Sequence, residues 1–269
     1  MTLTSTNNLA VLASEDKVCK TLGIKFITSP EIVYIARNAG FDALFIDLEH
    51  SSLSIQAASQ LCTAALTINM SPFVRVPGHS GSGFIQRVLD CGAQGVIFPH
   101  VDTADQARTA VSMSKYPPLG KRSVTGMLPH VGFRSASIEE VSRVGNAQLS
   151  TVIVMVESPH AVSNADAIAA VEGVDVVLIG TNDLSIELGI PGQFDHPTFA
   201  EAVQTIATAV RKHGKILGVA GIYNRSDILE DYVRRLGARK DGARDPGFLF
   251  SIVSSYTKTG GLPKDTYHI

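Results

Sequence analysis

Seven short apolar segments alternate with stretches of helical periodicity along the chain, and this alternation constrains the fold most strongly. The segments cover residues 22–27, 43–47, 72–76, 95–99, 151–157, 175–180 and 216–220. They are rich in β-branched residues and carry few charges, which is typical of parallel strands that are buried on both faces. The intervening stretches place apolar residues at helical spacing behind plausible N-caps. The pattern therefore predicts an α/β domain with a parallel sheet.

The length of the chain suits one particular α/β architecture. A chain of 269 residues has the usual size of a single (β/α)8 TIM barrel. We therefore interpret residues 1–269 as one (β/α)8 barrel domain. No Gly-x-Gly-x-x-Gly follows any predicted strand, so a dinucleotide-binding fold is not indicated. The eighth strand should lie near Gly237, but residues 237–247 are polar and make a poor buried strand, which is the weakest point of the barrel interpretation.

Composition excludes several classes of partner. The formal net charge is −2, no basic run is present and Trp is absent, so nucleic acid is not an expected partner. The longest apolar runs are far too short to cross a membrane. The three cysteines, Cys19, Cys62 and Cys91, lack the spacing of metal ligands and are typical of reduced thiols. The polar N-terminus does not resemble a signal peptide, so a cytoplasmic location is expected.

Two acidic residues follow neighbouring predicted strands. Glu157 closes the segment that begins at Thr151, and Asp183 comes shortly after the segment that ends at Gly180. The carboxyl ends of parallel strands are where α/β folds build their active sites. Two carboxylates there would supply the oxygen ligands that suit a divalent cation. The alternative is that both residues are helix N-caps, since acidic residues commonly follow strands for that reason alone.

The strand-end sequences, taken in order, resemble those of the HpcH/HpaI aldolase family. These are metal-dependent pyruvate aldolases of the phosphoenolpyruvate/pyruvate barrel superfamily. The resemblance rests on Phe45-Ile-Asp-Leu-Glu-His50, Val74-Arg-Val-Pro77, Leu89-Asp-Cys-Gly-Ala-Gln94, Met155-Val-Glu157 and residues 173–185, and it runs from about residue 22 to 236. Residues 99–102 and 117–123 look more like the macrophomate synthase branch, whose members decarboxylate oxaloacetate to an enolate.

The resemblance implies a metal-dependent carbon–carbon lyase. Such an aldolase interconverts a 4-hydroxy-2-oxo acid with pyruvate plus an aldehyde through a metal-stabilised pyruvate enolate. An alternative is an oxaloacetate decarboxylase or a macrophomate synthase-like enzyme that uses the same enolate. A catalytically silent barrel is a further alternative. The expected cofactor is a divalent metal ion, with Mg²⁺ as the first choice and Mn²⁺ or Co²⁺ also suited.

The resemblance also implies catalytic roles for individual residues. Glu157 and Asp183 match the metal ligands, and Arg75 matches the arginine that binds the pyruvyl oxygen and stabilises the enolate. The alternative for Arg75 is a structural salt bridge at the barrel rim. His50 and Asp90 match a His–Asp pair that activates water or transfers the proton of the 4-hydroxyl group. The alternative for His50 is that it only caps the following helix.

Two smaller groups complete the implied site. Asp47 and Glu49 match acidic residues that organise the water around the metal, although either would serve equally well as an acid at a helix N-terminus. Backbone amides around Thr181, Asn182 and Asp183, which enter the next helix, are expected to bind the substrate carboxylate. The chain departs from the family at Thr181 and Asn182, so the metal assignment is better supported than any substrate assignment.

The family also implies an oligomer. Its members exchange C-terminal helices between subunits, so we expect a homotrimer or homohexamer with an exchanged C-terminal helix. Residues 248–253, Phe-Leu-Phe-Ser-Ile-Val, form an apolar segment after the polar stretch near Gly237. Such a segment would be costly to leave in water. We interpret it as part of the region that contacts a second subunit.

Overall fold

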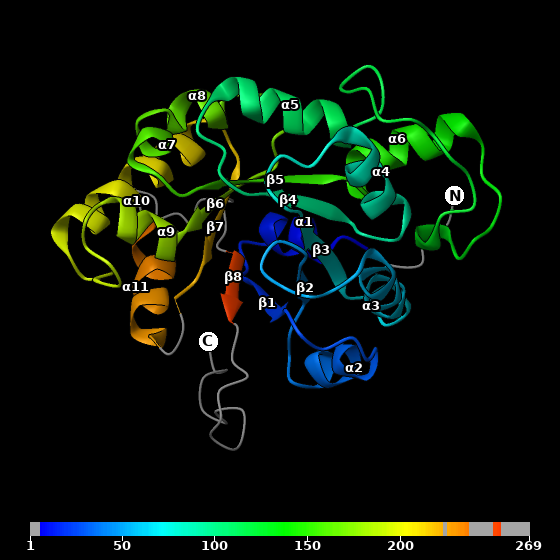
Figure 1. Ribbon diagram of the computed structural model, residues 1–269, viewed down its shortest axis with the longest axis horizontal. Coiled ribbons are helices and arrows are strands. Elements are labelled where there is room, and N and C mark those ends of the chain that lie inside the picture. The colour runs from blue at the N-terminus through cyan, green and yellow to red at the C-terminus, as the bar shows by residue number, and fades with distance from the viewer. Residues whose placement is uncertain (1–5, 223–224, 237–249, 254–269) are drawn as a thin grey trace.

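Eight parallel strands form the centre of the protein (Figure 1). The computed structural model describes residues 6–222, 225–236 and 250–253. Each strand pairs with the next along the chain, and the last strand pairs with both the seventh and the first, in the order of a closed barrel. The strands are β1 (Cys19–Ile24), β2 (Ala43–Asp47), β3 (Ser71–Arg75), β4 (Gly95–Phe98), β5 (Thr151–Val156), β6 (Val176–Gly180), β7 (Ile216–Ala220) and β8 (Phe250–Val253). The predicted α/β fold around one curled parallel sheet is confirmed.

The eighth strand lies elsewhere than the sequence analysis placed it. The prediction of a strand near Gly237 is wrong, because β8 is formed by Phe250–Val253. The backbone of this segment pairs with β7 and β1, and its contact with a second subunit stays a prediction. Aromatic and β-branched residues suit a strand better than the polar stretch before them does. Residues 237–249, and the C-terminal helix expected after β8, lie outside the described residues.

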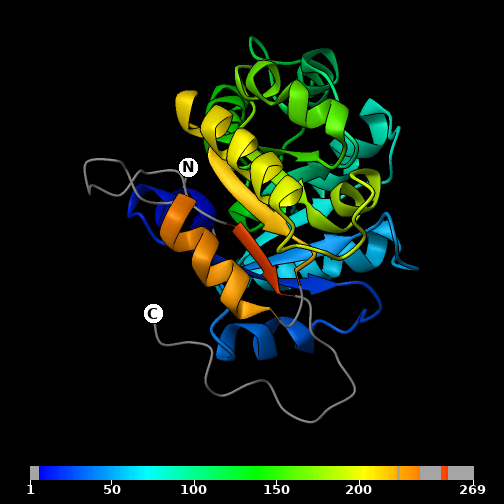
Figure 2. The same cartoon turned by 90° about the vertical axis from the view of Figure 1, so that its left-hand side faces the viewer.

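Helices cover the outside of the sheet, as Figures 1 and 2 show. Local capping fixes several of their starts: the Ser54 side chain accepts from the Ala57 amide, and Thr103 and Gln106 form a capping box. Within the described ranges, no helix is long and apolar enough to cross a membrane. The helices are α1 (Asn8–Ser14), α2 (Glu31–Asn38), α3 (Ile55–Thr67), α4 (Ser82–Asp90), α5 (Ala104–Ser114), α6 (Ile138–Gln148), α7 (Pro159–Ser163), α8 (Ala165–Ala169), α9 (Thr181–Glu187), α10 (Pro197–Lys212) and α11 (Ser226–Leu236), with a 3₁₀ turn at Pro129–Val131.

Buried apolar side chains of the described residues form two layers about the sheet and a third, small cluster around Tyr116. The larger cluster lies between the sheet and the outer helices, where α10 runs along β7 (Figure 2). The smaller cluster fills the interior of the strand ring with alternate residues of the strands, such as Phe45, Phe73 and Ile153. Leu9 of α1 belongs to this inner cluster. The layers follow from the strand alternation, which sends successive side chains to opposite faces.

Helix α1 covers the amino ends of the strands. The Asn7 side chain donates to the Thr151 hydroxyl at 2.8 Å, at the start of β5. The Asn8 side chain donates to the Asp42 carbonyl at 2.9 Å, just before β2. Because this end is closed by α1, the carboxyl ends of the strands are the face at which a ligand can enter.

Candidate metal and substrate site

A cavity opens at the carboxyl ends of the strands. It has a volume of about 100 Å³ and is bounded by residues that end or follow β1, β2, β3, β6 and β7, together with one residue of β5. Its lining residues are Gly23, Lys25, Phe45, His50, Arg75, Met155, Gly180, Thr181, Asn182, Asp183, Ala220 and Gly221. Five of the residues singled out from the sequence therefore share one cavity: His50, Arg75, Thr181, Asn182 and Asp183.

Arg75, which lines this cavity, forms a buried ion pair with Asp47. The strand register pairs them directly, and the guanidinium donates from Nε to Oδ1 at 3.0 Å and from Nη2 to Oδ2 at 2.6 Å. Burial raises the pKa of Asp47, but the hydrogen bonds and charge of Arg75 outweigh burial and hold that pKa below its usual value. Asp47 is therefore a carboxylate that orients Arg75.

Arg75 has two further neighbours that fix its orientation. Its Nη1 lies 3.1 Å from Glu49 Oε2, and its guanidinium carbon lies 5.3 Å from the centroid of the Phe45 ring. The salt bridge that was the alternative reading of Arg75 is thus formed, and the same side chain lines the cavity. Because a guanidinium has five N–H groups, donors remain for a ligand after these contacts.

Glu157 lies beyond the end of β5 as a buried carboxylate, only 2% exposed. His100 Nδ1 lies 3.3 Å from its Oε2, and Oε1 is buried without a hydrogen-bond partner within the described part of the chain. Burial raises the pKa of Glu157 to about 7; His100 and Arg75 oppose the rise, and Asp183 and Glu49 add to it. A buried oxygen without a partner is costly unless a ligand supplies one.

Glu157 packs against the end of the neighbouring strand. A Cβ atom added to Gly180 would lie 2.5 Å from Glu157 Cγ and 3.0 Å from Oε1, so only glycine leaves room for this carboxylate. Neither acid is a helix N-cap, because Ser158 caps α7 and Gly180 occupies the cap position of α9. The alternative reading of the two acids as N-caps is therefore wrong.

The acids that follow β5 and β6 fit a divalent cation. Glu157 offers an oxygen without a partner, and the charge of Asp183 acts on the same carboxylate. Among the residues described here, no group of three or more His, Cys, Asp or Glu side chains could hold a metal ion alone. Two carboxylates would leave ligand positions open for water and substrate oxygens, as magnesium sites usually do.

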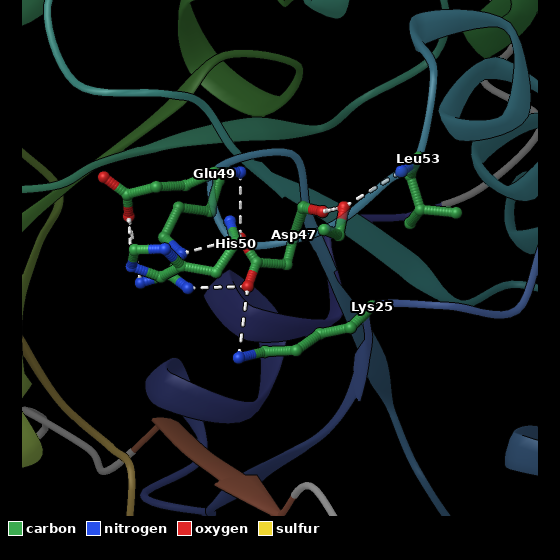
Figure 3. Close-up of polar contacts among 7 residues, drawn as sticks. Lys25, Asp47, Glu49, His50 and Leu53 are labelled. Carbon is green, nitrogen blue, oxygen red and sulfur yellow. Dashed lines mark hydrogen bonds and ion pairs between the residues drawn. The ribbon is translucent and has the colours of Figure 1, made fainter.

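His50 lies at the mouth of the cavity, with its side chain 59% exposed. Its Nε2 is 3.7 Å from Glu49 Oε2, and its backbone amide donates to Asp47 Oδ1 at 3.2 Å (Figure 3). His50 does not cap the next helix, since that position belongs to Ser54. A side chain so exposed at the mouth is free to reach a bound substrate.

The predicted pair of His50 and Asp90 is not formed in this chain. Asp90 is the last residue of α4, and its carboxylate accepts a hydrogen bond from Arg122 at 2.7 Å. Helix α4 runs from the end of β3 back towards the start of β4, so its last residue lies at the end of the barrel away from the cavity. His50 and Asp90 are therefore not in contact within one chain, and a catalytic part for Asp90 stays a prediction.

Thr181 has a structural role through its hydroxyl group. Its Oγ1 donates to the Ala220 carbonyl at 2.8 Å, and the side chain is fully buried. This bond ties the start of α9 to the end of β7. Asn182 is exposed in the same helical turn and Asp183 is half-buried. Their predicted binding of the substrate carboxylate stays a prediction.

The structure adds two residues that we did not assign from the sequence. Lys25 follows β1 and lines the cavity, with its Nζ 3.5 Å from Asp47 Oδ2. His100 follows β4 in a left-handed backbone conformation with φ of 51° and contacts Glu157. The signal was available for His100, a polar residue directly behind the predicted strand 95–99, whereas Lys25 lay inside the first predicted strand, 22–27.

Comparison with known proteins agrees with this geometry. The family described as HpcH/HpaI aldolase/citrate lyase matches residues 26–241. A 4-hydroxy-4-methyl-2-oxoglutarate aldolase (tasA) of Hapsidospora irregularis is 49% identical over 233 residues, which cover 87% of this chain and 86% of the relative. The crystal structure of an HpcH/HpaI aldolase from Desulfitobacterium hafniense DCB-2 is 30% identical with a TM-score of 0.79, over 90% of this chain and 89% of that one.

A further structural relative is similar in fold alone. Macrophomate synthase has a TM-score of 0.72 and 23% identity, over 93% of this chain and 85% of that one. The family match spans residues 26–241, and a relative 49% identical covers 87% of the chain. The chain described here therefore belongs to the HpcH/HpaI aldolase/citrate lyase family.

Proposed function

We propose that this protein is a metal-dependent carbon–carbon lyase that cleaves a 4-hydroxy-2-oxo acid to pyruvate and a second carbonyl compound, and catalyses the reverse addition. The observation that carries the proposal is that Asp183 and an oriented Arg75 line one cavity and that the charges of both act on the buried carboxylate of Glu157. The relative that is 49% identical is named a 4-hydroxy-4-methyl-2-oxoglutarate aldolase, which supports this class of substrate.

Glu157 and Asp183 would hold the divalent cation, for which Mg²⁺ is the first choice and Mn²⁺ or Co²⁺ are alternatives. Support comes from the buried, unpartnered Oε1 of Glu157 and from the charge coupling between the two acids. When bound, such a cation would act as a Lewis acid that draws negative charge towards the 2-oxo group. Glu49, which contacts Arg75 and His50, would orient water near this centre.

Arg75 would bind the oxygens of the 2-oxo acid end of the substrate. Its guanidinium is permanently charged and is oriented in advance by Asp47. Because the guanidinium of Arg75 does not need to reorganise during the reaction, it would stabilise the negative charge that develops on the 2-oxo oxygen. Thr181 and Asn182, through backbone amides at the start of α9, are proposed to bind the substrate carboxylate together with Asp183.

His50 would take the proton of the 4-hydroxyl group. As the bond between carbons 3 and 4 breaks, this oxygen becomes the carbonyl oxygen of the second product. The electron pair of the bond stays on carbon 3 as the enolate of pyruvate, and a proton then returns to that carbon. The support for His50 is its place at the cavity mouth beside Glu49, and imidazole is suited to proton transfer near neutral pH.

We further propose that the complete protein is a (β/α)8 barrel whose C-terminal helix is exchanged within a homotrimer or homohexamer, and that it is cytoplasmic. The strand pairing of β8 with β1 and β7 supports the barrel. Sedimentation equilibrium at micromolar concentration tests the assembly, and a monomeric mass would contradict it.

An assay with reconstituted metal tests the proposed reaction. The protein is stripped of metal with a chelator, supplied with Mg²⁺, Mn²⁺ or Co²⁺, and offered a panel of 4-hydroxy-2-oxo acids and oxaloacetate. We expect metal-dependent release of pyruvate from at least one 4-hydroxy-2-oxo acid. Pyruvate from oxaloacetate alone would indicate a decarboxylase, and no pyruvate from any compound would indicate a catalytically silent barrel.

A further inference from the structure

Lys25 lies across the cavity from the proposed metal carboxylates. In the ring of eight strands, β5 is the strand farthest from β1, and Glu157 follows β5 while Lys25 follows β1. Lys25 and Asp183 nevertheless line the same cavity. A substrate whose 2-oxo acid end is anchored near Glu157 and Asp183 would therefore extend its other end towards β1 and Lys25.

The ammonium group of Lys25 is only weakly used by the protein itself. Within the described ranges, its one ion pair is with Asp47 Oδ2 at 3.5 Å, which is long for a hydrogen bond (Figure 3). That oxygen already accepts from Arg75 Nη2 at 2.6 Å. The Lys25 side chain is 37% exposed. Its three N–H donors are thus available to a ligand in the cavity.

Arg75, the other positively charged side chain that lines the cavity, makes more contacts within the protein than Lys25 does. Arg75 donates two hydrogen bonds to Asp47 and forms an ion pair with Glu49. Several other lining residues of the cavity, Gly23, Phe45, Ala220 and Gly221, are small or apolar and carry no charge. A flexible ammonium in such surroundings suits a carboxylate, with which it forms a charge-assisted hydrogen bond.

We propose that Lys25 binds the distal carboxylate of the substrate, so that the enzyme prefers dicarboxylic 4-hydroxy-2-oxo acids to those with an uncharged tail. The proposal rests on the proposed lyase function, because it takes the 2-oxo acid end to lie at Glu157, Asp183 and Arg75. It makes Lys25 a residue that determines specificity and assigns no step of bond breaking to it.

Two substrates of matched shape test the proposal. They are 4-hydroxy-4-methyl-2-oxoglutarate and 4-hydroxy-4-methyl-2-oxopentanoate, in which a methyl group replaces the distal carboxylate. The measured quantity is the ratio of their kcat/KM values. We expect Lys25→Met to lower this ratio by roughly 10- to 100-fold, the range for losing a hydrogen bond to a charged group, and Lys25→Arg to restore most of it.

A control variant separates this effect from the loss of one positive charge. Lys17 lies just before β1 at the closed end of the barrel, with its side chain 63% exposed and paired with Glu15. We expect Lys17→Met to keep the ratio of the unaltered protein. Thermal denaturation of each variant shows whether it is folded, and Lys25→Gln provides a second neutral variant.

A binding measurement gives a readout that needs no turnover. 2-Oxoglutarate and 2-oxopentanoate lack the 4-hydroxyl group and differ only in the distal carboxylate. Calorimetry on the metal-loaded protein should show tighter binding of 2-oxoglutarate, and this preference should be lost in Lys25→Met. If Lys25→Met weakened both ligands equally, or lowered both kcat/KM values by the same factor, Lys25 would act only on Asp47 and the proposal would be wrong. Failure of the unaltered protein to release pyruvate from any 4-hydroxy-2-oxo acid of the panel would instead refute the proposed function.

Discussion

Asp47 and Arg75 occupy paired positions at the ends of β2 and β3, where the guanidinium holds the carboxylate with two hydrogen bonds. Both side chains are almost completely removed from water. The same contacts that satisfy Asp47 also orient Arg75 before any substrate arrives. Local stability and the geometry of the proposed site therefore depend on one pair of residues.

Removing one partner of this pair should destabilise the protein strongly. Asp47→Ala leaves the buried guanidinium without its main counter-charge, which typically costs about 3–5 kcal/mol. Urea denaturation followed by circular dichroism should show a lower free energy of unfolding. The control is Asp166→Ala, which removes a carboxylate from an exposed pair with Lys212. An equal loss in both variants would contradict the structural role of Asp47.

Neutral variants of the two acids test the metal site. Glu157→Gln and Asp183→Asn keep the shape of the side chains but remove a charged ligand. Calorimetric titration with Mn²⁺ should show affinity reduced below detection in each, while the fold is retained because the site lies at the barrel mouth. Glu187→Gln, an exposed acid later in α9, serves as the matched control. Unchanged Mn²⁺ affinity in Glu157→Gln would refute the ligand assignment.

The raised pKa of Glu157 predicts how metal affinity depends on pH. Burial raises this pKa from 4.5 to about 7, and metal binding requires the ionised carboxylate. With this pKa, the ionised fraction increases about 30-fold between pH 5.5 and 8. The Mn²⁺ affinity of the metal-free protein should increase by a similar factor. The test is calorimetry at the two pH values, and a flat profile would mean that Glu157 is already ionised at pH 5.5.

The raised pKa of Glu157 also affects stability: metal affinity should increase with pH, whereas the contribution of Glu157 to the free energy of unfolding should decrease. Between pH 4.5 and about 7, the folded protein holds the Glu157 proton more tightly than the unfolded chain does. This residue therefore lowers the free energy of unfolding as pH rises through that window. Glu157→Gln should lose this contribution, so its advantage over the unaltered metal-free protein should grow from pH 5 to pH 7.5. Thermal denaturation of both proteins across this range gives the comparison.

Much of the site was predictable because parallel strands bring their carboxyl ends to one face. That rule put Glu157 and Asp183 at one face, and the family resemblance added Arg75 and His50; of these, His50, Arg75 and Asp183 line one cavity. The alternation of strands and helices was enough to predict the sheet. Lys25 was missed because the first strand was predicted to continue to residue 27, which put this lysine inside it. The strand ends at Ile24, so Lys25 instead stands at the cavity.

From the sequence we misplaced residues whose position depends on the direction of a helix or on which strands pair. Asp90 belongs to a helix that runs away from the site, and resemblance in sequence does not show which end of a helix a residue occupies. The place of β8 depends on its pairing with β7 and β1, which spacing along the chain does not determine. The raised pKa of Glu157 likewise required knowledge of its burial and neighbours.

A glycine offers a test of the site that removes no ligand. A Cβ atom at Gly180 would collide with the Glu157 side chain, which can move more easily than the strand backbone. Gly180→Ala should therefore displace the carboxylate and weaken Mn²⁺ binding at least 10-fold, with little loss of helical signal. Gly83→Ala is the control, because nothing lies within 4 Å of its added Cβ in helix α4. Equal metal affinity in both variants would argue against Glu157 as a ligand.

Replacing His50 should distinguish aldol cleavage from oxaloacetate decarboxylation, two reactions that pass through the same enolate. Aldol cleavage requires removal of the 4-hydroxyl proton as the carbon–carbon bond breaks, and a positioned base contributes about 10²- to 10⁴-fold to such a step. Decarboxylation of oxaloacetate needs no base, because carbon dioxide leaves without a proton transfer. His50→Ala should therefore reduce kcat for cleavage far more than kcat for decarboxylation, whereas Arg75→Ala should impair both.

The comparison is made on one metal-loaded preparation of each variant, with Mn²⁺ affinity measured in parallel. His160→Ala, which alters an exposed histidine of α7, is the control for loss of an imidazole. If cleavage and decarboxylation fell by the same factor in His50→Ala while Mn²⁺ affinity stayed intact, His50 would have no special part in proton transfer. Its effect would then come from Glu49, the acid beside it, which also contacts Arg75 and so influences a group that both reactions need.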